Sequence, residues 1–148
     1  MKFTKKALFT AFSILLTALA LVACRPAGPK IEVAEAWGRP SPLQAGNGAA
    51  YMTIENKGNE ADSLISAASD VSEVVEIHDM TMENDVMKMF RIDSIEIPAG
   101  GSATLAPGGK HVMFIELYEK LEIGQTITVT LEFEKSGTQT IEVEIRQP

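Results

Sequence analysis

The sequence predicts an all-β fold, a sandwich or barrel built from many short strands. Short stretches of the chain alternate apolar and polar side chains, as half-buried strands do. Turn-forming residues separate these stretches at short intervals, and no sustained helical period follows the N-terminal segment. The length that remains after that segment suits one domain with a sizeable core.

The N-terminal segment, residues 1–23, is typical of a secretory signal. Three lysines precede an apolar stretch over residues 7–23. Residues 21–24, Leu-Val-Ala-Cys, resemble a bacterial lipobox, which implies cleavage before Cys24 and lipidation of that cysteine. An uncleaved membrane anchor and simple secretion are the alternatives. Residues 24–30 contain prolines and a glycine and are expected to tether the lipid to a domain spanning residues 31–148.

Composition excludes several classes of ligand and site. Removing the three lysines of residues 1–23 leaves 10 basic and 20 acidic residues, which argues against nucleic acid and anionic lipid head groups as ligands. Cys24 is the only cysteine, so a lipidated chain has no disulfide. A blue-copper electron-transfer site is also excluded, because that site requires a cysteine ligand.

The first three strands are expected at residues 31–37, 49–55 and 63–68. In the second of them, Met52 and Ile54 would share one face while Tyr51 and Thr53 share the other. The intervening residues 56–59, Asn-Lys-Gly-Asn, have turn composition, since Asn and Gly tolerate positive φ.

The next two strands are expected to form a hairpin from residues 73–80 and 86–92, joined by a turn over residues 82–85. A turn centred between Glu83 and Asn84 places His78 directly opposite Met89, because a hairpin has a fixed register. His78 faces away from the more apolar side of its strand. The sequence therefore predicts an accessible histidine rather than a core one.

The second half of the chain continues the β pattern. Residues 112–117 are apolar on both faces, which is typical of a central strand, and Met113 is expected to share a face with His111, Ile115 and Leu117. The turn before this strand contains Gly108 and Gly109 and delivers His111. The remaining strands are expected at residues 94–97, 103–105, 126–134 and 139–145.

Both histidines of the chain and most of its methionines lie between residues 78 and 113. Two His-x-Met pairs, His78–Met80 and His111–Met113, mark the ends of this segment. Thioether sulfur is a soft neutral ligand and imidazole a borderline one, and together they suit Cu(I) better than Zn, Mg or Ca. Residues i and i+2 of a strand share a face, so His111 and Met113 can approach one ion.

With Met89 opposite His78, the predicted hairpin completes a metal-ligand set of His78, Met89, His111 and Met113. The alternative is that these methionines fill gaps in the core, which is a common role of methionine, and that each histidine is a hydrogen-bonded polar residue. Asp79 lies on the opposite face from His78 and is not counted as a ligand. Spacing alone leaves both interpretations open.

The spacing from His78 to Met89, then to His111 and Met113, resembles the signature of the PCu(A)C family of extracytoplasmic copper chaperones. Further segments resemble that family, among them residues 36–39, 50–56, 97–101 and 105–113. The resemblance implies a cupredoxin-like or Ig-like Greek-key β-sandwich or barrel that binds Cu(I) through His78, Met89, His111 and Met113. It also implies delivery to a copper-receiving protein, typically the copper centre of a cytochrome c oxidase or another copper chaperone.

The expected protein is thus a monomeric, lipid-anchored copper carrier outside the cytoplasm rather than an enzyme. Assigning both histidines to the metal leaves no base for a Ser or Cys nucleophile, and no Gly-x-Ser-x-Gly motif is present. The alternatives are a copper storage or resistance lipoprotein and an Ig-like interaction domain without metal.

Overall fold

The computed structural model describes residues 28–42 and 46–148, and every regular element in this part of the chain is a β-strand. None of it forms a helix capable of crossing a membrane. The predicted signal peptide and Cys24 lie outside the described residues. The strands are β1 (Ile31–Gly38), β2 (Asn47–Asn56), β3 (Asp62–Ser69), β4 (Ser72–Glu83), β5 (Val86–Arg91), β6 (Ile95–Ile97), β7 (Ser102–Leu105), β8 (His111–Leu117), β9 (Thr126–Phe133) and β10 (Gly137–Ile145).

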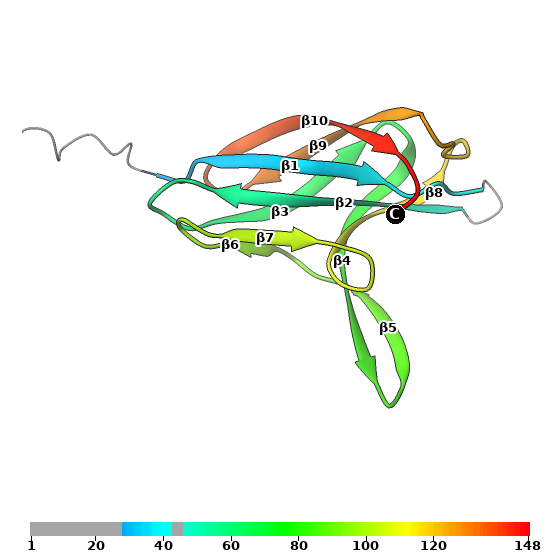
Figure 1. Cartoon of the computed structure of the whole chain (residues 1–148), viewed down its shortest axis with the longest axis horizontal. Coiled ribbons are helices and arrows are strands. Elements are labelled where there is room, and N and C mark those ends of the chain that lie inside the picture. The colour runs from blue at the N-terminus through cyan, green and yellow to red at the C-terminus, as the bar shows by residue number, and fades with distance from the viewer. Residues whose placement is uncertain (1–27, 43–45) are drawn as a thin grey trace, which may run out of the picture.

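The strands join in one sheet with the order β5-β4-β8-β2-β1-β10-β9-β3-β6, and β7 also pairs with β2. The pairing of β1 with β10 is parallel, and the other pairings between named strands are antiparallel. Figure 1 shows the sheet curling so that β3 and β9 lie behind β1 and β2, with β10 along the upper edge, whereas the β4–β5 hairpin projects as an arm. This arrangement confirms the predicted all-β class and every predicted strand.

The core lies between the two layers of the curled sheet. Period-2 alternation supplies its side chains: in β9, Ile127, Val129, Leu131 and Phe133 are buried while the residues between them are largely exposed. Full burial of such side chains contributes roughly 1.5–3 kcal/mol each relative to exposure. The cluster continues through Ile54, Leu64, Ile77, Val112, Phe114 and Val143.

The strand β8 departs from the predicted alternation near its end. Glu116 adopts φ 58°, a left-handed conformation that interrupts the period-2 pattern. As a result Leu117 joins Phe114 in the core, so the expectation that Leu117 shares a face with Met113 was wrong. A comparable interruption occurs at Glu35 in β1, where φ is 54° and the register with β2 shifts.

The hairpin register also differs from the prediction. Asn84 and Asp85 both have positive φ, 51° and 60°, as a two-residue type I′ turn requires. The turn therefore lies one residue later than expected, and β4 extends to Glu83. Met89 pairs with Met80, and His78 pairs with Arg91, so the predicted His78–Met89 pair was wrong. Because the register shifts by two residues, His78 and Met89 still share a face of the hairpin.

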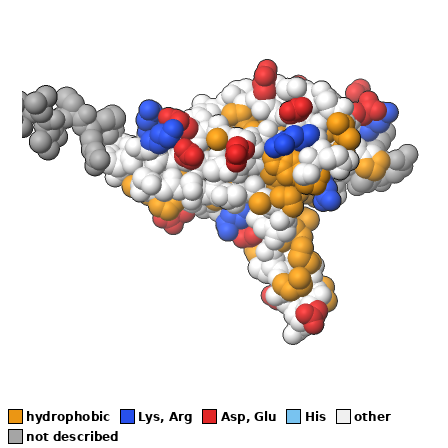
Figure 2. Space-filling model, viewed as in Figure 1, with side chains coloured by type: hydrophobic (Ala, Val, Ile, Leu, Met, Phe, Trp, Pro, Cys, Tyr) orange, Lys and Arg blue, Asp and Glu red, His pale blue; other side chains and the backbone are white. Residues whose placement is uncertain are grey.

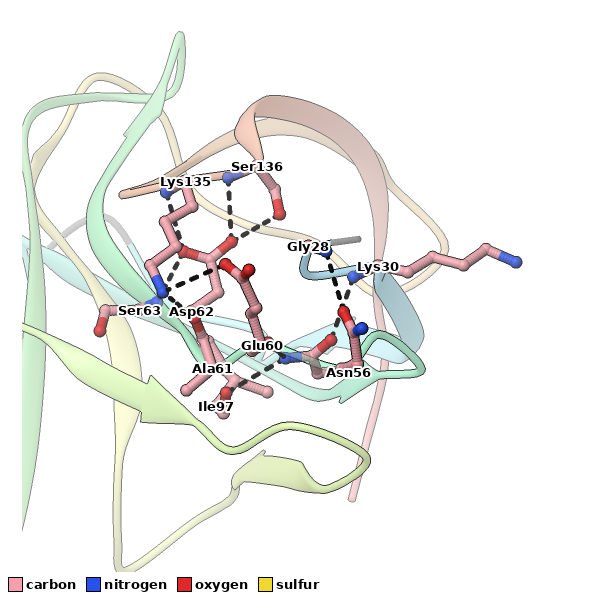
Figure 3. A network of polar contacts seen from close by, with 11 residues as sticks. Gly28, Lys30, Asn56, Glu60, Ala61, Asp62, Ser63, Ile97, Lys135 and Ser136 are labelled. Atoms are coloured by element: carbon pink, nitrogen blue, oxygen red, sulfur yellow. Dashed lines mark hydrogen bonds and ion pairs between the residues drawn. The ribbon is translucent and has the colours of Figure 1, made fainter. Parts of the chain in front are cut away.

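Two buried polar side chains fasten the end of the domain remote from this hairpin (Figure 3). Asp62 accepts hydrogen bonds from the backbone N–H groups of Ser63, Lys135 and Ser136 and from the Ser136 hydroxyl. Burial alone would raise the pKa of the Asp62 carboxyl, but these hydrogen bonds together outweigh it and lower the pKa.

Asn56 performs the same role for the chain entering β1. Its Oδ1 accepts hydrogen bonds from Lys30 N and Gly58 N, each at 3.0 Å, and its Nδ2 donates to Glu60 O and Ile97 O. Gly28 N in turn donates to Asn59 Oδ1. Residues 28–30, the end of the predicted tether, are thereby held against the turn between β2 and β3.

Candidate metal centre

Three neighbouring strands, β5, β4 and β8, bring the histidines and methionines onto one face of the sheet. His78 of β4 is the direct cross-strand partner of His111 of β8, and the ring centroids are 5.8 Å apart. Met113 lies two residues beyond His111 and therefore on the same face. Met89 faces the same way, because its cross-strand partner Met80 lies two residues beyond His78.

His111 is oriented by the turn that precedes it. The residues Pro107 to Lys110 reverse the chain, with Gly108 at φ 83°, a conformation that glycine adopts without strain. The His111 Nδ1–H donates to the carbonyl oxygen of Gly109 at 2.8 Å. Since a carbonyl only accepts, the proton resides on Nδ1 and the lone pair on Nε2. His111 is 3% exposed, so its ring is held within the protein and cannot swing freely.

His78 is oriented by its own strand. Its Nε2–H donates to Glu76 Oε2 at 2.8 Å, which leaves the lone pair on Nδ1. This Nδ1 is buried, and no hydrogen-bond partner for it exists within the described residues. A buried polar atom without a partner costs roughly 1–3 kcal/mol in desolvation. Coordination of a metal would satisfy it.

Glu76 acts on His78 as a carboxylate commonly acts on a metal-binding imidazole, fixing its tautomer and ring orientation. Hydrogen bonding from His78 lowers the pKa of the Glu76 carboxyl, and the charge of Arg91, whose Nη1 lies 3.2 Å from Oε1, acts in the same direction. Glu76 therefore remains ionised and engaged with these two partners.

A cleft of about 320 Å³ opens beside these residues. Its soft donor atoms are four thioether sulfurs and the imidazole of His111, whereas His78 is not among the residues that line it. Asp79, excluded as a ligand by the sequence pattern, instead forms an ion pair with Lys110 at 3.1 Å. The walls include Tyr51, Met80, Met87, Met89, His111 and Met113.

Tyr51 is a site residue that sequence reasoning did not identify. Its ring is buried, with its centroid 6.3 Å from that of His111 and 4.7 Å from that of Trp37. The guanidinium of Arg146 lies over Trp37 at 5.4 Å. Tyr51 reaches the site because β2 lies beside β8, and this strand order cannot be derived from the local sequence pattern.

The four predicted ligands are thus gathered on one face, though to different degrees. His78 and His111 are adjacent, Met113 lies beside His111, and Met89 approaches from the projecting arm with 46% of its surface exposed. Their role as ligands stays a prediction.

The LpqE-like family, named in full "Putative lipoprotein LpqE-like", matches residues 31–145. Among curated relatives, "Putative lipoprotein Lxx21020" of Leifsonia xyli subsp. xyli is 33% identical over 119 residues, covering 78% of this chain and 69% of that protein. "Uncharacterized protein RP573" of Rickettsia prowazekii is 26% identical over 124 residues, covering 81% of this chain and 68% of that protein.

Solved structures similar to this chain include the copper-bound PCuAC domain from PmoF2, with a TM-score of 0.67, 30% identity, and coverage of 84% of this chain and 97% of that domain. The apo PCuAC domain from PmoF1 has a TM-score of 0.68 and 27% identity, and the match covers 84% of this chain and 98% of that domain. The solution structure of CuI-DR1885 from Deinococcus radiodurans has a TM-score of 0.61 and 29% identity, and the match covers 86% of this chain and 85% of that protein. The chain therefore belongs to the LpqE-like, PCu(A)C-type family and has its cupredoxin-like β-fold.

Proposed function

We propose that the protein is a copper carrier that binds one Cu(I) ion through His78, Met89, His111 and Met113. The observation that carries this proposal is the pairing of two imidazoles whose unprotonated nitrogens, Nδ1 of His78 and Nε2 of His111, are left free by fixed hydrogen bonds. The similarity to copper-bound PCuAC structures supports copper as the cargo.

The donor set favours the cuprous ion over harder ions. Four neutral ligands leave the charge of Cu(I) uncompensated but match its softness, whereas Zn(II) and Ca(II) prefer thiolate, imidazole or oxygen. The negatively charged Glu76 accepts a hydrogen bond from His78. It therefore offsets part of the positive charge of the ion without coordinating it.

Release follows from the same arrangement. The methionine ligands do not titrate, and Met89 is exposed on the projecting hairpin, so an acceptor's ligands can replace the protein's ligands one at a time. We infer that the protein transfers its ion by such exchange and catalyses no reaction of its own. The copper centre of a cytochrome c oxidase, or another copper chaperone, is the proposed acceptor.

The proposed location is the extracytoplasmic side of a membrane, periplasmic or cell-surface, with the monomeric domain of residues 31–148 held by a lipid on Cys24 through the tether at residues 24–30. The relative named as a lipoprotein and the lipoprotein family support this placement.

Competition between the purified chain and a Cu(I)-specific chelator under anaerobic conditions tests the binding. One tightly bound ion is expected, with nitrogen and sulfur neighbours in X-ray absorption. Absence of competition would favour a metal-free interaction domain. A strain lacking the protein, grown at low copper, tests delivery: loss of oxidase activity that added copper restores supports it, whereas unchanged oxidase with lower copper tolerance indicates storage.

A further inference from the structure

The β4–β5 hairpin carries more thioethers than the proposed four-ligand site uses. Met80 pairs with Met89, and Met82 pairs with Met87, so four sulfurs form two adjacent cross-strand pairs. Directly opposed residues have Cβ atoms about 4.5–5.5 Å apart, and diagonal neighbours remain within reach of long side chains. The pairs follow one another from the cleft toward the tip of the arm.

These sulfurs are confined to one face of the hairpin. By register, the four methionines lie on the face that carries His78, whereas the opposite face carries Val86 and Phe90 as its large apolar side chains. Both faces are therefore partly apolar, but only the face toward the cleft contains sulfur. Apolarity alone does not account for this separation.

Core packing does not account for it either. Met82 and Met87 are 63% and 49% exposed, so they fill no gap in the interior. Figure 2 shows hydrophobic side chains running along the projecting arm and continuing onto the body of the molecule. Met80 and Met87 line the same cleft as His111 and Met113, which makes the arm continuous with the proposed inner site.

We propose that Met80, Met82 and Met87 form a second, outer Cu(I) site, connected by Met89 to the inner site. This inference rests on the proposed function, since the cargo is the same ion. Three thioethers on one face suit Cu(I) by softness. The outer site is weaker than the inner one, because it is exposed and lacks imidazole.

The ion moves between the two sites by ligand exchange. A bond from copper to Met89 forms while the bonds to Met82 and Met87 break, and bonds to Met113 and the two imidazoles then replace the bond to Met80. Every ligand is neutral, so copper remains Cu(I), and neither an electron nor a proton is transferred. The exposed tip of the hairpin is consequently where the ion enters and leaves.

Methyl NMR of the chain, labelled with ¹³C at its methionine methyl groups and titrated anaerobically with Cu(I), tests this directly. The first equivalent is expected to shift the Met89 and Met113 signals, and the second to shift those of Met80, Met82 and Met87. Met52, which is buried in the core on β2, provides an internal control whose signal stays in place. Each signal is assigned from the Met→Leu variant that lacks it.

The double variant Met82→Leu/Met87→Leu keeps the apolar character of the arm but removes two sulfurs. It is expected to take up only the first equivalent, whereas the control Val86→Leu on the opposite face takes up both. A second equivalent that leaves Met82 and Met87 unshifted, or that the double variant still binds, overturns the outer site. A first equivalent that leaves Met89 and Met113 unshifted instead contradicts the proposed inner site, so the two failures are distinguishable.

Discussion

His78 and His111 are direct cross-strand partners on β4 and β8, although 32 residues of chain separate them, and their ring centroids are 5.8 Å apart. Each ring is held by a hydrogen bond from one of its nitrogens, Nε2 for His78 and Nδ1 for His111, which leaves the other nitrogen with its lone pair. The pair is therefore oriented before any ion arrives, which limits the reorganisation that binding requires.

Replacing His111 with alanine is expected to weaken Cu(I) binding by at least about 100-fold, because loss of an outer partner of a ligand alone typically costs 10–100-fold. The measurement is chelator competition at fixed pH. Met52→Leu, a volume-conserving change in the core, is the control and is expected to leave the affinity unchanged. Equal affinities for His111→Ala and the unaltered chain would remove His111 from the ligand set.

Glu76→Gln is expected to weaken Cu(I) binding about tenfold, less than His111→Ala, since Glu76 orients His78 without touching the ion. The matched control is Glu73→Gln, which lies on the same strand but pairs with the Tyr118 hydroxyl at 2.9 Å. If the two glutamine variants bind equally well, the proposed orienting role of Glu76 is wrong.

The stability of the fold is expected to fall in acid because of Asp62. The folded state holds the pKa of this carboxyl below its ordinary value, so between the two values the unfolded chain binds more protons. The stabilisation is complete above the ordinary pKa and is lost as the pH falls through that value toward the lower folded one. Asp62→Asn should therefore lower stability at neutral pH and reduce its dependence on acid pH.

Urea unfolding of both chains across the acid range measures this effect. Asparagine would place an amide donor among the N–H and O–H donors of residues 63, 135 and 136, at a cost of roughly 1–3 kcal/mol. Parallel stability curves for the two chains, separated by a constant amount, would show that Asp62 does not titrate differently on folding.

Gly58→Ala is expected to destabilise the fold by about 1–3 kcal/mol, as overpacking does. A Cβ at this position would lie 2.5 Å from Lys30 N and closer still to the Gly28 carbonyl oxygen, both of which are backbone atoms. Gly109→Ala is the control, since its nearest neighbour would be the Ala106 carbonyl oxygen at 3.8 Å. Thermal unfolding that ranks the two variants equally would contradict this packing argument.

Local patterns were sufficient to predict the strands and the shared face of the four ligands. Side chains along a strand alternate with a period of two, so His111 and Met113, two residues apart, must share a face. The predicted hairpin register was wrong by two residues, an even number, and His78 and Met89 therefore remain on the same side. The position of the turn does not follow from its composition, because Glu83-Asn84-Asp85 allows two centres. Only the structure shows that Asn84 and Asp85 take the positive φ values.

Features that depend on strand order could not be predicted. Tyr51 lies beside His111 only because β2 and β8 are neighbours, and the hydrogen bond of Glu76 to His78 depends on the side-chain conformation of both residues. The positive φ of Glu116 likewise could not be predicted from the residue type, because glutamate rarely adopts this conformation.

The group that orients each histidine lies only two residues before it: Glu76 for His78 and Gly109 for His111. Each imidazole and its anchor are therefore encoded together in a tripeptide. Grafting the two tripeptides onto another antiparallel sheet, in the register that opposes the histidines, would transplant the oriented nitrogen pair.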